Sequence, residues 1–229
     1  MQNFNNSSSQ KGIAGSMSRF ALVNNYLYTV GNSFLNVFDI STSQQPTIDG
    51  NVNVGNWSIE TIFPFKGKLF IGSQNGMYIY NINNPDQPIL EGQFGHVRSC
   101  DPVVADDSFA YVTLRSGTAC QGFSNQLDIL QLNNFTNPSL VTSYNLTNPH
   151  GLSKDGSFLF ICDGNDGLKI YNAVDVNNIK LIKQFTGMDT YDVIANGNIA
   201  LVVAKDGLYQ YDYSNVNNIH LLSKINIAQ

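Results

Sequence analysis

The sequence predicts an all-β protein, a single five-bladed β-propeller made of four-stranded antiparallel blades. A short motif recurs five times along the chain with a period near 40 residues. Each copy carries four short β-rich runs, separated by turns of Gly, Asn and Asp. The 3.6-residue spacing of apolar side chains that indicates helices is hard to find anywhere. Four strands per repeat of about 40 residues is typical of propeller blades.

The motif reads LNVFDIS in its first copy, at residues 35–41. The other copies are MYIYNIN at 77–83, LDILQLN at 127–133, LKIYNAV at 168–174 and LYQYDYS at 208–214. The longest step between copies contains an insertion near 116–124. A β-sandwich would not repeat its sequence five times, and a β-helix has shorter repeats, so the propeller is favoured.

The second copy shows how each unit divides into strands. Its runs at 59–65, 69–72, 77–82 and 89–94 are separated by the turns Lys66-Gly67 and 74–76 and by the polar connector 84–88. Extending this pattern predicts a flexible Asn/Ser-rich leader at 1–15 and a propeller at 16–229. The expected blades are 16–54, 55–95, 96–145, 146–186 and 187–229.

The composition excludes two classes of protein. The chain has 229 residues, of which 13% are charged, and its 30 asparagines outnumber all Asp, Glu, Lys and Arg together. No apolar run approaches the ~18–20 residues of a membrane-spanning helix. The 12 Lys and Arg form no cluster, which argues against nucleic-acid binding. We expect a monomer without a cofactor.

Three cysteines are present, and none forms a C-x-x-C pair, so no metal site is expected. Cys100 begins an inner strand, and Cys120 lies in the insertion on the same face of the predicted disc. A Cys100–Cys120 disulfide would therefore pin the loop in an oxidising compartment, while the free thiols remain the alternative. Cys162 is expected to be buried in a strand.

The five copies align without gaps when Leu27, Leu69, Ala110, Leu159 and Ala200 are treated as equivalent. Nine residues earlier lies a set that we call the mouth column, because the inner strands of a propeller begin at the mouth of its channel. Every member is polar, yet no two are alike: Ser18, Glu60, Asp101, His150 and Tyr191. The next position holds Arg19, Thr61, Pro102, Gly151 and Asp192.

A column that is uniformly polar but chemically varied indicates five blades that supply different groups to one shared space. Two carboxylates, an imidazole, a phenol and a hydroxyl suit a sugar, a metal or a charged ligand, and crowded carboxylates raise each other's pKa. The competing interpretation is a solvated channel lining without function.

Further candidate residues allow both a functional and a structural interpretation. Arg98 beside Trp57 would bind an anion or a sugar, or would form a salt bridge or a packing contact between blades. The segment 163–167 (DGNDG) resembles the start of a calcium loop but lacks the distal Glu, so a hairpin turn is favoured. Asp163 is predicted to face His150 across a hairpin, where its carboxylate would fix the tautomer of the imidazole.

The repeat core and its Gln-Pro and Asn-Pro spacers resemble the LVIVD-repeat family. The resemblance runs from Arg19 to the C-terminus, with Gln131, Asn172 and Tyr213 departing from the consensus. Several segments look like the version found in surface lipoproteins of Bacteroidetes-type bacteria: 59–64 (IETIFP), 96–104 (HVRSCDPVV), 148–151 (NPHG), 162–164 (CDG) and 207–212 (GLYQYD). The resemblance implies a propeller exposed at the cell envelope, with no established reaction.

The first functional hypothesis is a non-catalytic binding or scaffold propeller at the cell surface. Its glycan, protein or small ligand would contact the channel-mouth face through Trp57, Glu60, Arg98, Asp101, His150, Tyr191 and Asp192. The alternative is a glycosidase-like hydrolase or lyase, with Glu60, Asp101, His150 and Asp192 as its catalytic groups, by analogy with other five-bladed propellers. A third hypothesis, an intracellular interaction propeller, rests on the lack of a signal peptide at residues 1–9.

Overall fold

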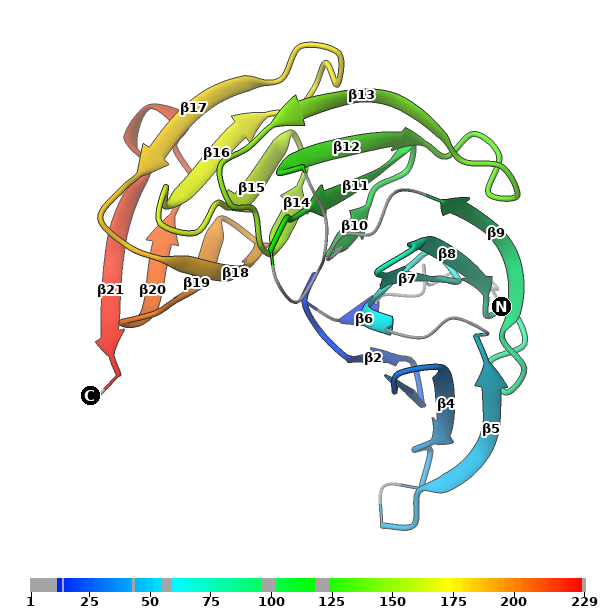
Figure 1. Cartoon of the computed structure of the whole chain (residues 1–229). Coiled ribbons are helices and arrows are strands. Elements are labelled where there is room, and N and C mark those ends of the chain that lie inside the picture. Colours follow the sequence, from blue (N-terminus) through cyan, green and yellow to red (C-terminus); the bar gives the residue numbers. More distant parts are fainter. Residues whose placement is uncertain are drawn as a thin grey trace, which may run out of the picture.

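The computed structural model describes residues 12–13, 15–42, 44–54, 59–95, 102–117 and 124–227. These residues form five antiparallel sheets that follow one another around an arc (Figure 1). The prediction of an all-β fold with five four-stranded blades is confirmed, and the first blade carries one additional short strand. No helix in this described part is long and apolar enough to cross a membrane.

Strands follow chain order within every sheet. Blade 1 contains β1 (Gly12–Ile13), β2 (Phe20–Val23), β3 (Tyr26–Val30), β4 (Phe34–Asp39) and β5 (Thr47–Asn53). Blade 2 contains β6 (Ile59–Phe65), β7 (Lys68–Ser73), β8 (Gly76–Asn81) and β9 (Ile89–Gly95). Blade 3 contains β10 (Val103–Ala105), β11 (Phe109–Leu114), β12 (Gln126–Gln131) and β13 (Ser139–Asn145). Blade 4 contains β14 (Leu152–Asp155), β15 (Phe158–Cys162), β16 (Leu168–Asn172) and β17 (Lys180–Phe185). Blade 5 contains β18 (Thr190–Asn196), β19 (Ile199–Ala204), β20 (Gly207–Asp212), a 3₁₀ turn at Val216–Asn218 and β21 (His220–Asn226).

Strand register confirms the gapless alignment of the five copies. The residues aligned from the sequence all pair with the same position of the inner strand: Leu22–Leu27, Pro64–Leu69, Ala105–Ala110, Lys154–Leu159 and Ala195–Ala200. Every blade also has a register shift at the same place between its third and fourth strands. Bulges bend a strand and increase its twist, which explains why the outer strand of each blade curves around the rim.

The Asp or Asn at the fifth motif position ends the third strand. Its side chain accepts a hydrogen bond from the backbone N–H two residues later, as Asp39 does from Ser41 at 2.6 Å and Asp212 from Ser214 at 2.7 Å. Asn81 and Asn172 make the equivalent bonds. This local bond competes with the sheet ladder and turns the chain toward the outer strand. In the third copy, Gln131 instead donates to Asn133 at 2.9 Å.

The described residues form four apolar clusters, one at each interface between successive blades. In the first interface, Tyr28 and Val37 of blade 1 pack with Ile62 and Ile71 of blade 2. The same pattern joins blades 2 and 3, 3 and 4, and 4 and 5. Each interior blade therefore buries two faces, a downstream face against the next blade and an upstream face against the preceding one.

The arc is bridged at its axis but open at its rim. Just before β2, Ser16 donates to Asp192 of blade 5 through its hydroxyl, at 3.0 Å, and accepts from the N–H of Leu152 in blade 4 at 2.8 Å. Toward the rim, β20 and β21 lie apart from β4 and β5 (Figure 1). The inner ends of the blades are thus tied together, and this is where the mouth column lies.

Candidate functional site

A cavity of about 220 Å³ lies at the channel mouth, among residues from four blades. Blade 1 contributes Met17 and Arg19, and the other blades contribute Glu60, Thr61, Pro102, Arg115, Pro149 and His150. Typical pockets for drug-sized ligands are about 300–1,000 Å³, so this space suits a smaller ligand. Two members of the mouth column, Glu60 and His150, therefore meet at one cavity.

Bulges position two members of the mouth column. In β6, Ile59 pairs with Ser73 and Thr61 with Gly72, so Glu60 is the extra residue. In β18, Tyr191 is extra in the same way between Thr190 and Asp192. A bulged residue leaves the ladder and its side chain is re-aimed, which is common beside binding sites. The carboxylate of Glu60 accepts from Gln74 at 3.2 Å.

His150 is buried, and its imidazole lies against an arginine. Arg115 Nη1 lies 3.2 Å from Nε2 of His150, and Nδ2 of Asn148 lies 3.3 Å from the same atom. A guanidinium only donates, so Nε2 is the acceptor and Nδ1 carries the proton. Burial, and then the charge of Arg115, lower the pKa of His150 to about 4. The imidazole is therefore neutral at physiological pH.

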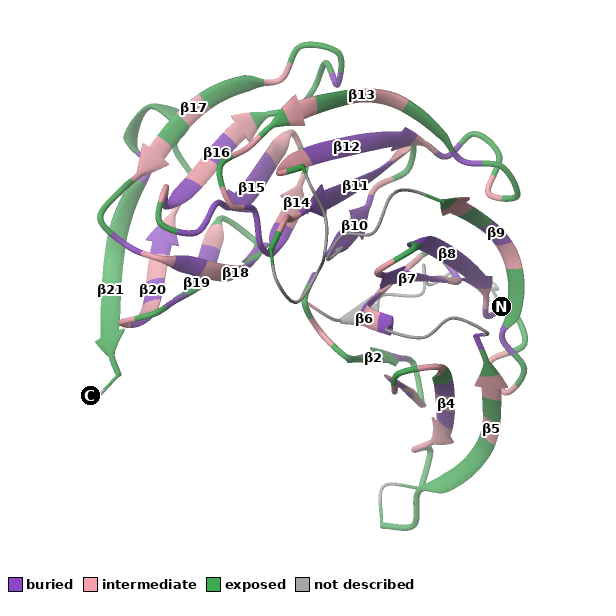
Figure 2. Ribbon diagram, in the orientation of Figure 1, coloured by how far each residue is buried: buried purple, intermediate pink, exposed green. Residues whose placement is uncertain are grey.

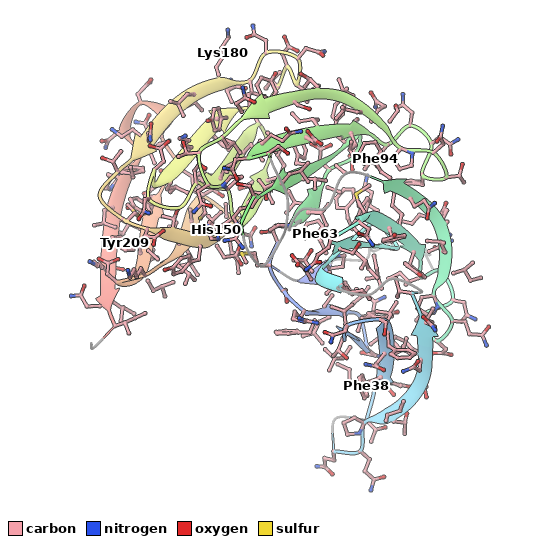
Figure 3. The ribbon with its side chains drawn as sticks, viewed as in Figure 1. Phe38, Phe63, Phe94, His150, Lys180 and Tyr209 are labelled. Atoms are coloured by element: carbon pink, nitrogen blue, oxygen red, sulfur yellow. The ribbon has the colours of Figure 1, made fainter. Side chains whose placement is uncertain are left out.

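Tyr191 packs against this imidazole rather than lining the cavity. The two rings meet edge-to-face, with centroids 5.6 Å apart. Its hydroxyl donates to Asp189 at 3.5 Å, and burial raises the pKa of Tyr191. In Figure 3, His150 lies near the inner ends of the blades, whereas Lys180 lies on the outer rim.

The carboxylate of Asp163 forms hydrogen bonds with the loop before His150 and not with the imidazole ring. Its fully buried carboxylate accepts from the backbone N–H groups of Thr147 and Asn148 at 2.7–3.1 Å and from Lys169 Nζ at 2.6 Å. The expectation that Asp163 fixes the imidazole tautomer is therefore wrong, because the carboxylate is turned toward these donors. The segment 163–167 is a hairpin turn, as favoured from the sequence, with Gly164 at φ 58° and Gly167 at φ 86°.

Asp192 is placed behind the cavity wall. Its carboxylate accepts from Ser16 Oγ at 3.0 Å and from the N–H of Val193 at 2.9 Å, and burial raises the pKa of Asp192 to about 6. It packs so closely on Gly151 that a Cβ there would lie 2.0 Å from Oδ1. Asp192 therefore ties blades 4 and 5 to the segment before β2, and it does not line the cavity.

The remaining predicted residues lie outside the described part of the chain. These are Trp57, Arg98, Asp101 and the cysteines Cys100 and Cys120. Cys162, the described cysteine, is buried as a free thiol, and burial raises its pKa. The expectation for Cys162 is confirmed.

Two arginines of the site were not selected from the sequence. The chain has three arginines in its 229 residues, and both Arg19 and Arg115 line this one cavity. Arg19 is exposed, and its Nη2 lies 3.5 Å from the carbonyl oxygen of Val30. Arg115 directly follows β11, where the insertion begins. The scarcity of arginine in the sequence is the signal that could have identified them.

A larger cavity of about 540 Å³ lies at the opposite ends of the inner strands, around the turns of blades 3 and 4. Its ionic groups bind one another. Asp106 accepts from Tyr111 at 2.8 Å and lies 3.4 Å from Lys154, while Asp107 pairs with Lys66. These internal pairs stabilise the turns, so the channel-mouth cavity is the stronger candidate for a binding site.

The chain is similar in fold to solved structures that are longer than itself. A protein from Lactobacillus plantarum matches 87% of this chain and 67% of its own with a TM-score of 0.70 and 16% identity. A functionally unknown protein from Desulfotomaculum acetoxidans matches 95% of this chain and 70% of its own, with a TM-score of 0.70 and 10% identity. No family model matches the chain, and no curated protein does. These likenesses support the fold alone.

Proposed function

We propose that the chain is a non-catalytic binding propeller that holds a small anionic ligand, the acidic sugar of a glycan, at the channel mouth. The observation that carries this proposal is the pair of arginines, Arg19 and Arg115, at one cavity of about 220 Å³. A planar guanidinium matches a carboxylate through two parallel hydrogen bonds.

The remaining lining groups suit a ligand that also has hydroxyls. Glu60 accepts hydrogen bonds, and the Nδ1–H of the neutral His150 is a donor by the tautomer argument above. Two guanidiniums, one carboxylate and one neutral imidazole give these described groups a net positive charge. The field at the mouth thus favours an anion, although the whole chain has a net charge of −5.

The cell surface is the proposed location, and the LVIVD-repeat family the proposed relationship. Both rest on the resemblance of the repeat cores and of segments such as 148–151 (NPHG) and 207–212 (GLYQYD). Glycans are abundant ligands outside the cell, which fits the sugar acid that the cavity favours.

The hydrolase or lyase alternative has weaker support from the geometry. Of its four catalytic candidates, Glu60 and His150 line the cavity, whereas Asp192 lies behind the wall. His150 directs Nε2 at Arg115, which occupies the lone pair that a general base would use.

The test compares binding of galacturonate and galactose by isothermal titration calorimetry. We expect the sugar acid to bind at least about tenfold more tightly, since a charged hydrogen bond is worth about 1.5–3 kcal/mol. Arg115→Gln and Arg19→Gln should each remove most of this preference, whereas Lys180→Gln, which removes one positive charge at the rim, should not. Equal binding of both sugars, or unchanged binding by both arginine variants, would refute the proposal. Turnover of nitrophenyl glycosides that disappears in Glu60→Gln would support the hydrolase instead.

A further inference from the structure

The two ends of the arc expose apolar side chains, and several of these occupy positions that every interior interface buries. Because the five blades align residue by residue, each exposed residue can be compared with its equivalents. We call Ile194, Leu201, Val203, Leu208 and Ile225 the blade-5 end face, and Phe20, Leu22 and Leu27 the blade-1 end face. Strand pairing places the members of each set on one face of its sheet.

On the blade-5 end face, Leu201 is 39% exposed and Val203 is 44% exposed. The residues equivalent to Leu201 are all nearly inaccessible: Tyr28 at 0%, Phe70 at 0%, Tyr111 at 1% and Phe160 at 0%. The equivalents of Val203 are buried in the same way, namely Val30, Gly72, Thr113 and Cys162. The downstream face of blade 5 is therefore built as an interface, and no blade formed by the described residues covers it.

The blade-1 end face, which is the upstream face of its sheet, is also more exposed than the equivalent faces of the other blades. Phe20 is 55% exposed, whereas its equivalents, Ile62, Val103, Leu152 and Val193, are at most 1% exposed. Leu22 is 38% exposed, against 5% for Ala105 and 8% for Ala195. Figure 2 allows the outer strands to be compared: β13 in the middle of the arc includes half-buried residues, whereas β21 at the end is exposed along its length.

Polar side chains on the two end faces already have partners within their own blades. Gln210, at the position of the buried Val37, Ile79, Ile129 and Ile170, accepts from Ser223 at 3.1 Å. On blade 1, Asn36 donates to Thr29 at 3.4 Å and accepts from Asn51 at 2.7 Å. An incoming blade therefore needs to supply mainly apolar surface.

We propose that the two end faces receive two further four-stranded blades, which close the arc into a seven-bladed ring. The similar solved structures support this number, since this chain matches only 67% and 70% of their lengths. Five blades are about seven tenths of a seven-bladed propeller, and propellers typically have four to eight blades. In Figure 1, β21 and β4 lie apart at the rim, and they belong to separate sheets.

A second copy of the chain fits these faces less well. Joining the blade-5 end face of one copy to the blade-1 end face of another is a head-to-tail contact, which grows into a filament unless it closes. Two copies closed in this way would have ten blades, which exceeds the usual range. Direct closure of the five blades on themselves would bury Leu201 and Phe20, which are exposed.

The test extends the full chain with a copy of two of its three interior blades, blades 2 and 3 (residues 59–145), joined after residue 227. We expect the extended protein to be a monomer by light scattering, to bind much less of the hydrophobic dye ANS, and to unfold at least about 5 °C higher than the original chain. The double variant Leu201→Asp/Val203→Asp should abolish these gains. The control Val174→Asp/Leu181→Asp should preserve them, because Val174 and Leu181 are 76% and 51% exposed and belong to the interior blade 4.

The original chain provides a second measurement that does not depend on the extension folding. There, Val203→Asp should shift the unfolding midpoint by less than about 2 °C, because the side chain faces solvent. A large loss of stability would show that the five blades close on themselves in solution, and would overturn the proposal. A stable dimer or filament of the original chain that Val203→Asp disperses would favour the second copy and also overturn it. Equal ANS binding by the original and extended chains would do the same.

Discussion

Replacing Asp192 by Asn should change how the stability of the protein depends on pH. Burial raises the pKa of Asp192 from 3.8 to about 6, while the unfolded chain keeps the ordinary value. Between these two values the folded protein binds more protons than the unfolded chain. The wild-type protein therefore gains stability from this group at low pH and loses it as the pH rises through about 6. The full shift corresponds to about 3 kcal/mol.

Between pH 4 and pH 7, the contribution of Asp192 to the free energy of unfolding therefore falls by about 2.5 kcal/mol. The Asn variant lacks this proton uptake but keeps an oxygen that accepts from Ser16 and Val193. The free energy of unfolding of the variant minus that of wild type should therefore be about 2.5 kcal/mol higher at pH 7 than at pH 4. The variant is thus relatively more stable at pH 7. Urea denaturation of both proteins at four or five pH values measures this difference, and titrations common to both cancel.

The variant Ser16→Ala provides a second test, because the hydrogen bond from the Ser16 hydroxyl lowers the pKa of Asp192. Without it the pKa should rise further, and the window of proton uptake should move to higher pH. A difference between Asp192→Asn and wild type that stays constant from pH 4 to 7 would refute the reasoning. It would mean that the carboxylate is solvated rather than held between Gly151 and Ser16.

Three further changes probe the neighbouring groups. His150→Asn should have the opposite pH dependence, because the pKa of His150 in the folded protein, about 4, lies below its ordinary value of 6.5. As the pH falls from 7 to 5, the free energy of unfolding of wild type should decrease by about 2 kcal/mol through this group, and that of the variant should not, as measured by urea denaturation. Gly151→Ala should destabilise the fold by about 1–3 kcal/mol, since its Cβ would lie 2.0 Å from Asp192 Oδ1, whereas Gly95→Ala, with no atom within 4 Å, should be nearly neutral in thermal unfolding. Asp163→Asn should cost about 2 kcal/mol, because the charged bond from Lys169 at 2.6 Å is weakened, and should shift the amide resonances of Thr147 and Asn148; unchanged resonances would contradict the role assigned to this carboxylate.

The sequence predicts the blades well because the repeat encodes the register directly. Aligned residues such as Leu69 and Ala110 occupy the same rung of their ladders, and the Asp or Asn of the motif forms the same local bond in four blades. These features depend on contacts within about one hairpin, so a single repeat carries all the information needed. The burial of interior faces follows from the same periodicity.

The site is less predictable because side-chain direction depends on contacts between blades. Asp192 and Glu60 occupy neighbouring columns of the alignment, yet one lies behind the wall and the other lines the cavity. The bulges at Glu60 and Tyr191 decide which neighbour points inward, and a bulge leaves little signal in one sequence. Arg115 reaches the mouth from the end of β11 by the length of its side chain, which an alignment of Cα positions does not capture.

The ligand proposal and the closure proposal depend on separate parts of the molecule. The lining of the cavity comes from blades 1 to 4, and the bonds of Ser16 to Asp192 and Leu152 tie the inner ends of blades 4 and 5 to the segment before β2. No member of either end face lines the cavity. Val203→Asp should therefore leave sugar-acid binding unchanged, just as Arg115→Gln should leave blade addition unchanged. Each change perturbs one surface, so the failure of one proposal would leave the evidence for the other intact.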